Sequence, residues 1–298
     1  MIRVDLGQPG QTLPSSAVAL GFFDGYHLGH QAVVREVRGA SGLAAVAFTF
    51  RNHPRDVLQP GSGPRLLTSF EERAELLEQA GLDYLAWCDF TPELAQVAAE
   101  AFVSEWLVGR MNARLVAAGP NFRFGHKAQG SPATLQAAGR FEVRIVPPVE
   151  RDGAVVSSTR IRGLVAQARL DEAALLLSRP CFVTGRVEAG QQVGRQLGTP
   201  TANLAVDEWR QYPPHGVYAV RCDGWPAVAN LGVRPTFGDH RARLEVHLLD
   251  RQEDLYGKLI RVDFIRHLRP EQRFPSPDAL REQIGRDVAQ ARACLLEG

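Results

Sequence analysis

The spacing of hydrophobic and polar positions divides this chain into two halves with different patterns. Up to about Arg179, short apolar runs alternate with segments in which apolar residues recur at helical spacing. Continuous apolar strands separated by helices are typical of a parallel sheet that helices cover on both faces. The strands expected here span residues 17–20, 43–50, 84–87, 115–118 and 143–146. The first half is therefore predicted to be an α/β domain.

Capping signals mark the starts of several helices in this half. Residues that favour helix N-caps are followed by proline or by acidic residues of the first turn. These signals stand at Thr68 or Ser69 before Glu71 and Glu72, at Thr91-Pro92-Glu93, and at Ser131-Pro132. Asp171 opens a last helix over residues 172–177, which Arg179-Pro180 ends. The domain boundary is therefore predicted between residues 179 and 180.

From Phe182 onward, short strands follow one another without helices between them. Such runs indicate an antiparallel sheet or barrel. The expected strands span residues 182–187, 217–221, 227–231, 244–249 and 259–264. Ser276-Pro277-Asp278 then begins a helix with one apolar face. Residues 180–298 are predicted to form an antiparallel β-barrel with a closing helix.

The composition excludes several classes of protein. Of the 298 residues, 34 are Lys or Arg and 33 are Asp or Glu, which gives a net charge of +1. This balance provides no strong positive field for nucleic acid or for an anionic membrane, so neither is expected as a partner. Nothing in the sequence indicates an obligate protein partner.

Cysteine usage and the N-terminus indicate a cytoplasmic protein. Four cysteines, at positions 88, 181, 222 and 294, form no Cys-x-x-Cys pair and are expected to be reduced thiols. The first residues contain an acid and no long apolar core, so no signal peptide is expected. The longest apolar-rich run, 42–50, is too short to cross a bilayer.

The ten residues from Gly21 to His30 form the candidate site of the first half. They follow the apolar run 17–20 and precede a segment of helical spacing, so they lie where a strand turns into a helix N-terminus. Unpaired N–H groups and the helix dipole favour a phosphate there. His27 and His30 lie one helical turn apart and can point at the same anion. A packed or solvated histidine, or a metal pair without further ligands, explains the stretch less well.

Two other segments follow predicted strands. The loop 119–125 contains Asn121, Arg123 and two phenylalanines, which suits stacking on a flat ring but is equally compatible with a solvated turn. The segment 156–162, Val-Ser-Ser-Thr-Arg-Ile-Arg, runs into a helix. One hydroxyl would cap that helix, but three hydroxyl groups followed by two arginines indicate a polyphosphate site.

In the second half the candidate site is the glycine-rich segment 185–203. It lacks the Gly-Lys-Ser/Thr of a Walker loop, and the polar residues between its glycines argue against a membrane-helix contact. A glycine-rich hairpin is the ordinary alternative. Thr201 and Asn203 add oxygen donors that suit Mg²⁺ and phosphate, which favours a nucleotide site.

These motifs together resemble one enzyme family. The segment 23–30, Phe-Asp-Gly-Tyr-His-Leu-Gly-His, resembles the His-x-Gly-His signature of nucleotidylyltransferases, in the form found in bacterial bifunctional riboflavin kinase/FAD synthetases. The segments 119–125 and 157–162 resemble that family's Gly-x-Asn-Phe-Arg-Phe-Gly and Ser-Ser-Thr-x-Ile-Arg motifs. The segment 194–203 resembles the riboflavin kinase signature with its Pro-Thr-Ala-Asn, and segments 230–237, 244–247, 255–257 and 268–269 also match.

Two places depart from the family pattern. The segment 48–54 resembles a family segment that is usually richer in aspartate and proline, but it carries Arg51 and Asn52, so no catalytic role is assigned to it. Thr199 stands where the family often has an aromatic residue, which concerns local packing only.

The resemblance implies a Rossmann-like nucleotidylyltransferase domain followed by a β-barrel kinase domain. It implies that ATP with Mg²⁺ phosphorylates riboflavin to FMN, and that ATP then adenylylates FMN to FAD with release of pyrophosphate. The expected partners are thus riboflavin, FMN, FAD and ATP. Adenylyl transfer needs no protein nucleophile, because the FMN phosphate attacks directly, so the protein contributes positioning and charge neutralisation.

The site residues expected from the resemblance follow the motif positions. His27 and His30 are expected to be catalytic in adenylyl transfer, and Glu245 to be the base of the kinase reaction. Glu245 lies opposite Leu244 and Val246 in the strand alternation; without the kinase motifs it would be interpreted as a surface carboxylate. Nucleotide and phosphate contacts are expected from Gly21, Phe23, Asp24, Gly29, Ser158, Thr159, Arg162, Gly194, Arg195 and Gly198, flavin contacts from Asn121, Arg123 and Phe124, and Mg²⁺ contacts from Thr201 and Asn203.

Two alternatives remain open at this point. In the first, the C-terminal half is a non-catalytic flavin-binding or regulatory module beside a nucleotidylyltransferase; a riboflavin kinase assay tests it. In the second, the N-terminal half acts on another phosphate ester, such as a phosphopantetheine or a cytidylyl acceptor. The second is tested by finding which acceptor compound leads to consumption of ATP and release of pyrophosphate.

Overall fold

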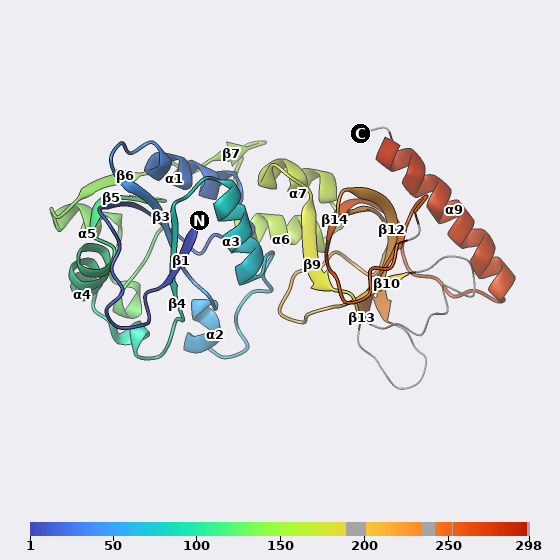
Figure 1. The fold of residues 1–298 in the computed structure, drawn as a ribbon, viewed down its shortest axis with the longest axis horizontal. Coiled ribbons are helices and arrows are strands. Elements are labelled where there is room, and N and C mark those ends of the chain that lie inside the picture. Colours follow the sequence, from blue (N-terminus) through green and yellow to red (C-terminus); the bar gives the residue numbers. More distant parts are fainter. Residues whose placement is uncertain (189–200, 234–241, 252, 297–298) are drawn as a thin grey trace. The chain divides into compact units, whose positions relative to one another are not determined.

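The computed structural model describes residues 1–188, 201–233, 242–251 and 253–296. These residues form two compact units, Met1–Ser158 and Thr159–Gly298 (Figure 1). The fold of each unit follows from the patterns of its own half of the sequence.

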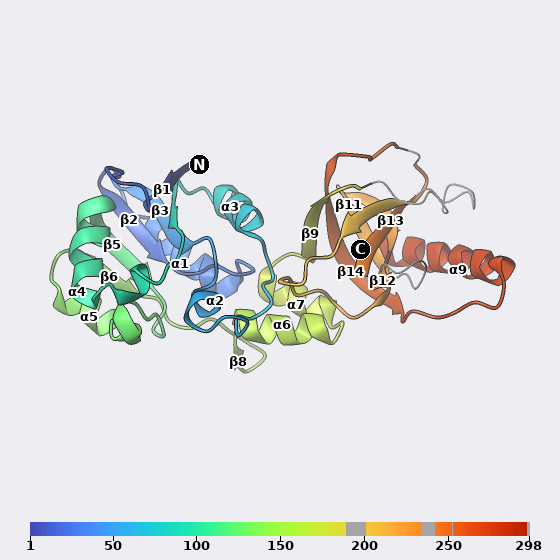
Figure 2. The same ribbon diagram turned by 90° about the horizontal axis from the view of Figure 1, so that it is seen from below.

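The first unit is built on a six-stranded parallel sheet, as the apolar runs predict. The strand order is β1-β4-β3-β2-β5-β6 (Figures 1 and 2). The strands are β1 (Ile2–Asp5), β2 (Ser16–Leu20), β3 (Ala44–Phe50), β4 (Tyr84–Cys88), β5 (Ala113–Ala118) and β6 (Glu142–Ile145). The edge strand β1 was not expected, because its sequence Ile-Arg-Val-Asp includes two charged residues and forms no apolar run.

Helices connect these strands and cover the sheet. They are α1 (Leu28–Arg38), α2 (Pro54–Leu58), α3 (Phe70–Gln79), η1 (Leu94–Gln96), α4 (Ala99–Ala101), η2 (Phe102–Arg110), η3 (His126–Ala128) and α5 (Pro132–Ala137), and a small hairpin of β7 (Glu150–Arg151) and β8 (Ala154–Val155) follows β6. Ser69 caps α3 and Ser131 caps α5, each in a capping box, which confirms two of the predicted starts.

The helix expected from Thr91 is wrong in its position. Thr91 Oγ1 does accept a hydrogen bond from the N–H of Leu94, at 3.2 Å, but only the 3₁₀ turn η1 follows. The regular helix begins at Ala99 and continues as the π-helical segment η2. Phe102 and Trp106 of η2 pack into the core beneath the sheet, so tertiary packing rather than the cap sets where this helix lies.

The second unit is an antiparallel near-barrel of six strands, as predicted. Its strand order is β10-β13-β12-β11-β14-β9, and a bridge between Glu188 and Asn203 connects the two edges. The strands are β9 (Cys181–Arg186), β10 (Ala202–Ala205), β11 (Gly216–Cys222), β12 (Trp225–Val233), β13 (Ala242–Leu248) and β14 (Leu259–Arg269). Among the described strands of this unit, only β10 was not expected, because its first two residues lie within the glycine-rich segment 185–203.

In the described residues, three helices belong to this unit or begin at its edge. α6 (Ser158–Ala166) begins at the last residue of the first unit, and α7 (Leu170–Leu177) packs against β9 and β14. Leu170 of α7 is buried in the barrel core, together with Val183 and Tyr218.

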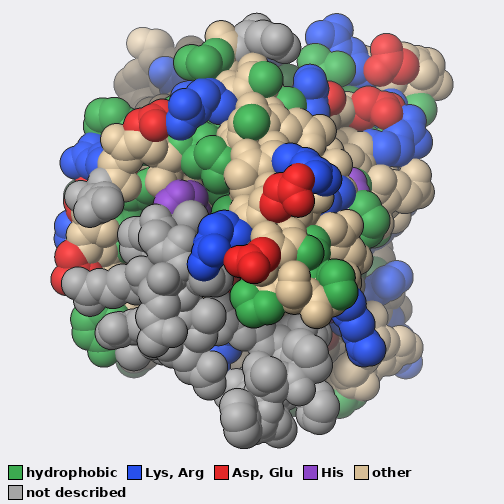
Figure 3. Space-filling view, turned by 90° about the vertical axis from the view of Figure 1, so that its right-hand side faces the viewer, with side chains coloured by type: hydrophobic (Ala, Val, Ile, Leu, Met, Phe, Trp, Pro, Cys, Tyr) green, Lys and Arg blue, Asp and Glu red, His purple; other side chains and the backbone are tan. Residues whose placement is uncertain are grey.

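The closing helix α9 (Pro277–Leu296) begins where the sequence predicts, with Ser276 Oγ accepting from the N–H of Ala279 at 3.2 Å. It packs on the outer face of the barrel, where Ala291 and Leu295 form a cluster with Val217, Ala219 and Val228. On the side of the molecule that carries α9, basic and acidic side chains lie beside one another (Figure 3). Ion pairs on or beside this helix include Arg281–Asp278, Arg286–Glu282 and Arg292–Asp250.

Candidate active sites

The segment Gly21–His30 begins directly after β2, at the point where the order of the first sheet reverses. β2 pairs with β3 on one side and with β5 on the other. In open α/β sheets, ligands bind beyond the C-terminal ends of the strands at such a switch point. The histidine turn, as we call residues 21–30, therefore lies where a ligand of this sheet is expected.

Positive φ angles bend the histidine turn sharply between β2 and α1. They occur at Phe23 (57°), Gly25 (74°) and Tyr26 (38°). For a bulky residue this conformation is strained and persists only where the surroundings hold it. Phe23 is fully buried and Tyr26 is 7% exposed, so packing holds both in place.

His27 and His30 form the N-terminus of α1. His27 is the N-cap, and its Nδ1 accepts a hydrogen bond from the backbone N–H of His30 at 3.4 Å. Their imidazole rings stack, with centroids 3.7 Å apart and planes inclined by 17°. The prediction that the two histidines lie together at a helix N-terminus is confirmed.

Buried surroundings keep His30 uncharged at neutral pH. Its Nδ1 is buried without a hydrogen-bond partner, and the Phe23 ring meets its ring edge-on at 5.3 Å. Burial, followed by repulsion from His27 and Arg73, holds the pKa of His30 well below its usual value of 6.5. A neutral imidazole donates a hydrogen bond from one nitrogen only.

Asp24 ties the histidine turn to the residues before α3. Its Oδ1 accepts hydrogen bonds from the N–H of Leu67 (2.8 Å) and from the N–H and hydroxyl of Thr68 (3.2 and 3.3 Å). The hydroxyl oxygen of Thr68 accepts in turn from the N–H of Gly25 at 2.9 Å. Asp24 was expected to contact the nucleotide; its buried carboxylate instead binds N–H and O–H groups of the protein itself. Nucleotide contact by Asp24 stays a prediction.

Two glycines make room for aromatic rings of the turn. A Cβ atom at Gly29 would lie 3.1 Å from Cε1 of His27, and one at Gly21 would lie 3.0 Å from the ring of Phe23. Both distances are tighter than ordinary carbon contacts. A side chain at either position would therefore displace a ring that supports the site.

Ser158 lies against the histidine turn. Its Oγ donates to the carbonyl oxygen of Asp24 at 2.9 Å. Thr159 and Arg162 follow in α6, where Arg162 Nη2 donates to Thr159 Oγ1 at 3.0 Å. These two residues belong to the second compact unit, so their contact with the nucleotide stays a prediction.

The loop 119–125 does not present Phe124 as an open stacking surface. Phe124 is 7% exposed and packs against Phe102 at 5.3 Å, while Phe122 stacks on it at 5.8 Å. Asn121 and Arg123 are exposed. Phe124 thus supports Phe122, the half-buried ring that the sequence analysis did not single out. The flavin contacts of Asn121, Arg123 and Phe124 stay predictions.

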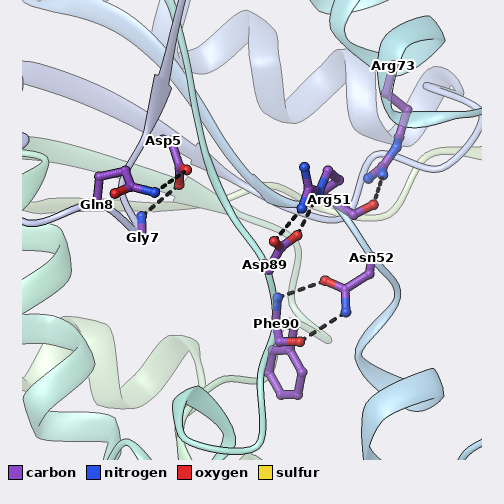
Figure 4. Close-up of polar contacts among 8 residues, drawn as sticks. All are labelled: Asp5, Gly7, Gln8, Arg51, Asn52, Arg73, Asp89 and Phe90. Carbon is purple, nitrogen blue, oxygen red and sulfur yellow. Dashed lines mark hydrogen bonds and ion pairs between the residues drawn. The ribbon is translucent and has the colours of Figure 1, made fainter.

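Arg51 and Asn52, which depart from the family pattern in segment 48–54, connect the ends of β3 and β4 (Figure 4). The Arg51 guanidinium binds the Asp89 carboxylate through Nε and Nη2, at 2.8 and 2.5 Å. The Asn52 side chain exchanges two hydrogen bonds with the backbone of Phe90, at 2.9 and 2.8 Å. Both contacts lie beyond the C-terminal ends of these strands and give Arg51 and Asn52 a structural role.

In the second unit, Glu245 lies in a row of polar residues across three strands. It pairs with Asn203 of β10 on one side and with Asn230 of β12 on the other. Residues paired directly across a sheet point to the same face. Asn203 is 5% exposed, and Glu245 and Asn230 are half-buried. Glu245 is therefore not the fully exposed carboxylate that the pattern alone suggests.

Among the predicted Mg²⁺ ligands, Thr201 and Asn203 lie next to each other at the start of β10. Asn203 Nδ2 donates a hydrogen bond to the carbonyl oxygen of Thr201 at 3.4 Å. The side-chain amide oxygen of Asn203 and the hydroxyl oxygen of Thr201 are the candidate metal ligands of this pair. Oxygen donors of this kind, with few protein ligands and several phosphate oxygens, suit Mg²⁺. The predicted residues Gly194, Arg195 and Gly198 lie outside the described residues.

Comparisons with known proteins match both halves of the chain. The FAD synthetase family model matches residues 10–160, and the riboflavin kinase family model matches residues 177–295. A Pseudomonas fluorescens protein named bifunctional riboflavin kinase/FMN adenylyltransferase is 41% identical over 285 residues, which are 92% of this chain and 91% of that protein. The Escherichia coli K12 protein of the same name is 37% identical over 287 residues, with the same coverage.

The chain belongs to the bifunctional riboflavin kinase/FMN adenylyltransferase family. Both catalytic domains of the family are present in it, and the resemblance stated from the motifs is confirmed.

The fold also recurs over the whole chain in a solved structure. A crystal structure of a Streptococcus pneumoniae protein, which bears the name macrolide-efflux protein, aligns with a TM-score of 0.87. The alignment covers 98% of this chain and 99% of that one, at 32% identity. In the part of this chain that the structure describes, no helix is long and apolar enough to cross a membrane.

Three residues near the two sites were not found by sequence reasoning. Thr68 was read only as a possible helix cap, yet its hydroxyl binds the histidine turn. Asn230 opens the family-like segment 230–237, so its position was available as a signal, but its pairing with Glu245 was not. Arg73 gave no signal, because an arginine in a segment of helical spacing is normally exposed.

Proposed function

We propose that the first unit transfers the adenylyl group of ATP to FMN and that the second unit phosphorylates riboflavin with ATP. One chain then converts riboflavin to FAD in two steps. The observation that carries this proposal is the presence of two separate sets of suitable side chains. The stacked histidines lie at a helix N-terminus in the first unit, and Glu245 lies beside Asn203 in the second.

For adenylyl transfer, the proposed chemistry forms one bond and breaks one. An oxygen of the FMN phosphate bonds to the α-phosphorus of ATP, and the bond from that phosphorus to the pyrophosphate oxygen breaks. Negative charge develops on the departing pyrophosphate. His27 and His30 are proposed to donate hydrogen bonds to it at the helix N-terminus, where the dipole favours an anion.

Other residues are proposed to position the substrates of this step. Backbone groups at Gly21, Phe23 and Gly29 border the phosphates, and Ser158, Thr159 and Arg162 extend the phosphate contacts along α6. Asn121, Arg123 and Phe124 are proposed to contact the flavin. These assignments rest on motif positions.

For the kinase step, we propose Glu245 as the general base. The carboxylate accepts the proton of the terminal ribityl hydroxyl as that oxygen bonds to the γ-phosphorus, and the bond to ADP breaks. Thr201 and Asn203 would hold Mg²⁺, which neutralises phosphate charge when bound. Gly194, Arg195 and Gly198 are proposed phosphate contacts from the motif.

The proposal assigns residues 1–179 to the adenylyltransferase and residues 180–298 to the kinase, in the cytoplasm. The match to the FAD synthetase model ends at residue 160, and the match to the riboflavin kinase model begins at residue 177. Residues 161–176 are assigned to neither model. The compact units divide after residue 158, so α7 and all of α6 except Ser158 belong to the second unit.

One experiment tests both activities. The purified chain is incubated with riboflavin and Mg-ATP, and FMN is separated from FAD by chromatography while pyrophosphate is measured. We expect FMN first, then FAD with equimolar pyrophosphate, and neither product when a chelator removes the metal. FAD formed from added FMN without any phosphorylation of riboflavin would identify the second unit as a non-catalytic module. FMN without FAD or pyrophosphate would assign another acceptor to the first unit.

A further inference from the structure

Arg73 is the largest fully buried side chain in the described part of the chain, with an exposed fraction of 1%. It lies in the first turn of α3. Its Nη1 donates to the carbonyl oxygens of Phe22 (2.7 Å) and Phe50 (3.1 Å). Its Nη2 donates to the carbonyl oxygen of Arg51 at 2.8 Å (Figure 4). One guanidinium therefore binds the backbone at the ends of both β2 and β3.

The remaining contacts of Arg73 complete this arrangement. Its Nε donates to the carbonyl oxygen of Ser69 at 3.4 Å, and its Nη1 also reaches the hydroxyl of Thr49 at 3.3 Å. That hydroxyl donates to the carbonyl oxygen of Phe22 at 3.1 Å. The guanidinium also lies over the ring of Phe22, 4.2 Å from its centroid.

A short path leads from Arg73 to the histidines. Phe22 immediately precedes Phe23, the buried residue at φ 57° whose ring supports His30. Asp24 and Gly25, which come next, are held by Thr68 just before α3. Hydrogen bonds from α3 and from Thr68, the residue two before it, therefore hold the histidine turn on both sides of Phe23.

Charge gives Arg73 a second effect. Its hydrogen-bond partners are carbonyl and hydroxyl oxygens, so no carboxylate of the described residues binds it directly. Burial lowers its pKa to about 10, while Asp24 and Glu71 act in the opposite direction, so the side chain is charged at neutral pH. A buried cation without a bonded counter-ion is costly to the fold. It is, however, well placed to favour anions at the adjacent helix N-terminus.

We propose that Arg73 is a positioning residue for adenylyl transfer: it fixes the histidine turn through the carbonyl groups of Phe22, Phe50 and Arg51, and it supplies a fixed positive charge behind the phosphate site. The proposal rests on the assignment of His27 and His30 to that reaction. A displacement of about 1 Å in a catalytic group lowers turnover by on the order of 10²-fold.

Two substitutions separate the two parts of the proposal. Arg73→Met removes both the hydrogen bonds and the charge, whereas Arg73→Lys keeps the charge but not the planar fork. We expect about a 10²-fold lower kcat for FAD formation in both variants. Riboflavin phosphorylation by the same preparations should stay at the wild-type rate, because the kinase residues lie in the other unit.

Histidine titration by NMR provides a readout that lost stability alone would not change. The groups that act on the charge of His30 are His27 from its own turn and Arg73 from α3. In Arg73→Met the pKa of His30 should rise, because a neighbouring positive charge is gone, while burial and His27 still hold it below its usual value. In Arg73→Lys it should stay low. This measurement needs no enzymatic activity, so it tests Arg73 even if FMN is not the acceptor.

Leu77→Ala is the matched control. Leu77 is fully buried in the same helix, one turn beyond Arg73, and has no polar contact with the histidine turn. It should lower the melting temperature while leaving kcat and the His30 titration unchanged in folded protein. The proposal is overturned if both Arg73 variants keep wild-type kcat for FAD formation. It is equally overturned if Arg73→Met lowers the melting temperature as Leu77→Ala does and leaves the His30 titration unchanged.

Discussion

The backbone N–H of His30 donates a hydrogen bond to Nδ1 of His27, which leaves the proton of a neutral His27 on Nε2. The N-cap bond of α1 thus selects the tautomer of the first histidine. The choice of tautomer is thus tied to the formation of the helix.

Replacement of either histidine should stop FAD formation and spare the kinase. In His27→Ala or His30→Ala, FMN adenylylation should fall by about 10²–10³-fold per lost donor, by analogy with oxyanion-hole contacts. Riboflavin phosphorylation in the same samples, measured by chromatography of FMN, is the internal control. An equal loss of both activities in a folded variant contradicts the assignment.

The stability of the first unit should fall as the pH drops below about 6.5. Because the pKa of folded His30 lies well below 6.5, the unfolded chain takes up a proton there that the folded chain does not bind. Above that pH both states are neutral and the contribution vanishes. Thermal melting from about pH 8 to about pH 5 measures the effect, and His30→Phe should flatten this part of the profile. A wild-type melting temperature that is constant over this range would show that His30 titrates normally.

Glu245→Gln should lower kinase turnover by about 10²–10⁴-fold, since it keeps shape and hydrogen bonding but removes basicity. ATP affinity should change little, and adenylyl transfer should be intact. Glu253→Gln is the control, because Glu253 is another carboxylate of this unit and pairs with Lys258 and Arg251 on the surface. If Glu245→Gln retains wild-type turnover, another group is the base.

Two fragments test the domain boundary. A fragment starting at Thr159 keeps α7, whose Leu170 is buried in the barrel core; one starting at Pro180 lacks it. We expect both to phosphorylate riboflavin and the longer one to melt at the higher temperature, since losing one buried leucine costs about 2–5 kcal/mol. Circular dichroism and the kinase assay measure this. Inactivity of both fragments would mean that the kinase unit does not fold alone.

Much of the fold was predictable because apolar runs and caps are local signals. The strands around Val18, Val46 and Val116 are continuous in sequence, so their parallel sheet followed from spacing alone. β10 was missed because a four-residue strand beside a glycine-rich segment has no period of its own. Thr91 does cap a turn, as predicted, but the helix itself begins later, where Phe102 and Trp106 pack into the core.

The sites were predictable only where a motif carries them in one stretch. His27 and His30 could be placed at a helix N-terminus from the residues between them. Arg73 and Asn230 could not, because their roles depend on contacts with residues 51 positions away, in the case of Phe22, or across a strand pair. The hydrogen bonds that the buried carboxylate of Asp24 accepts from Leu67 and Thr68 were likewise out of reach of sequence reasoning, because only the folded chain brings these residues together.

The bond from Ser158 to the carbonyl of Asp24 spans 134 positions of sequence. At synthesis rates of about 5–20 residues per second, the chain emerges for about 7–27 s between these two residues. The histidine turn is thus among the first segments of the protein to be made and among the last of its unit to be completed. A ribosome-bound chain that ends before residue 158 lacks this closing contact, however much of the sheet has already formed.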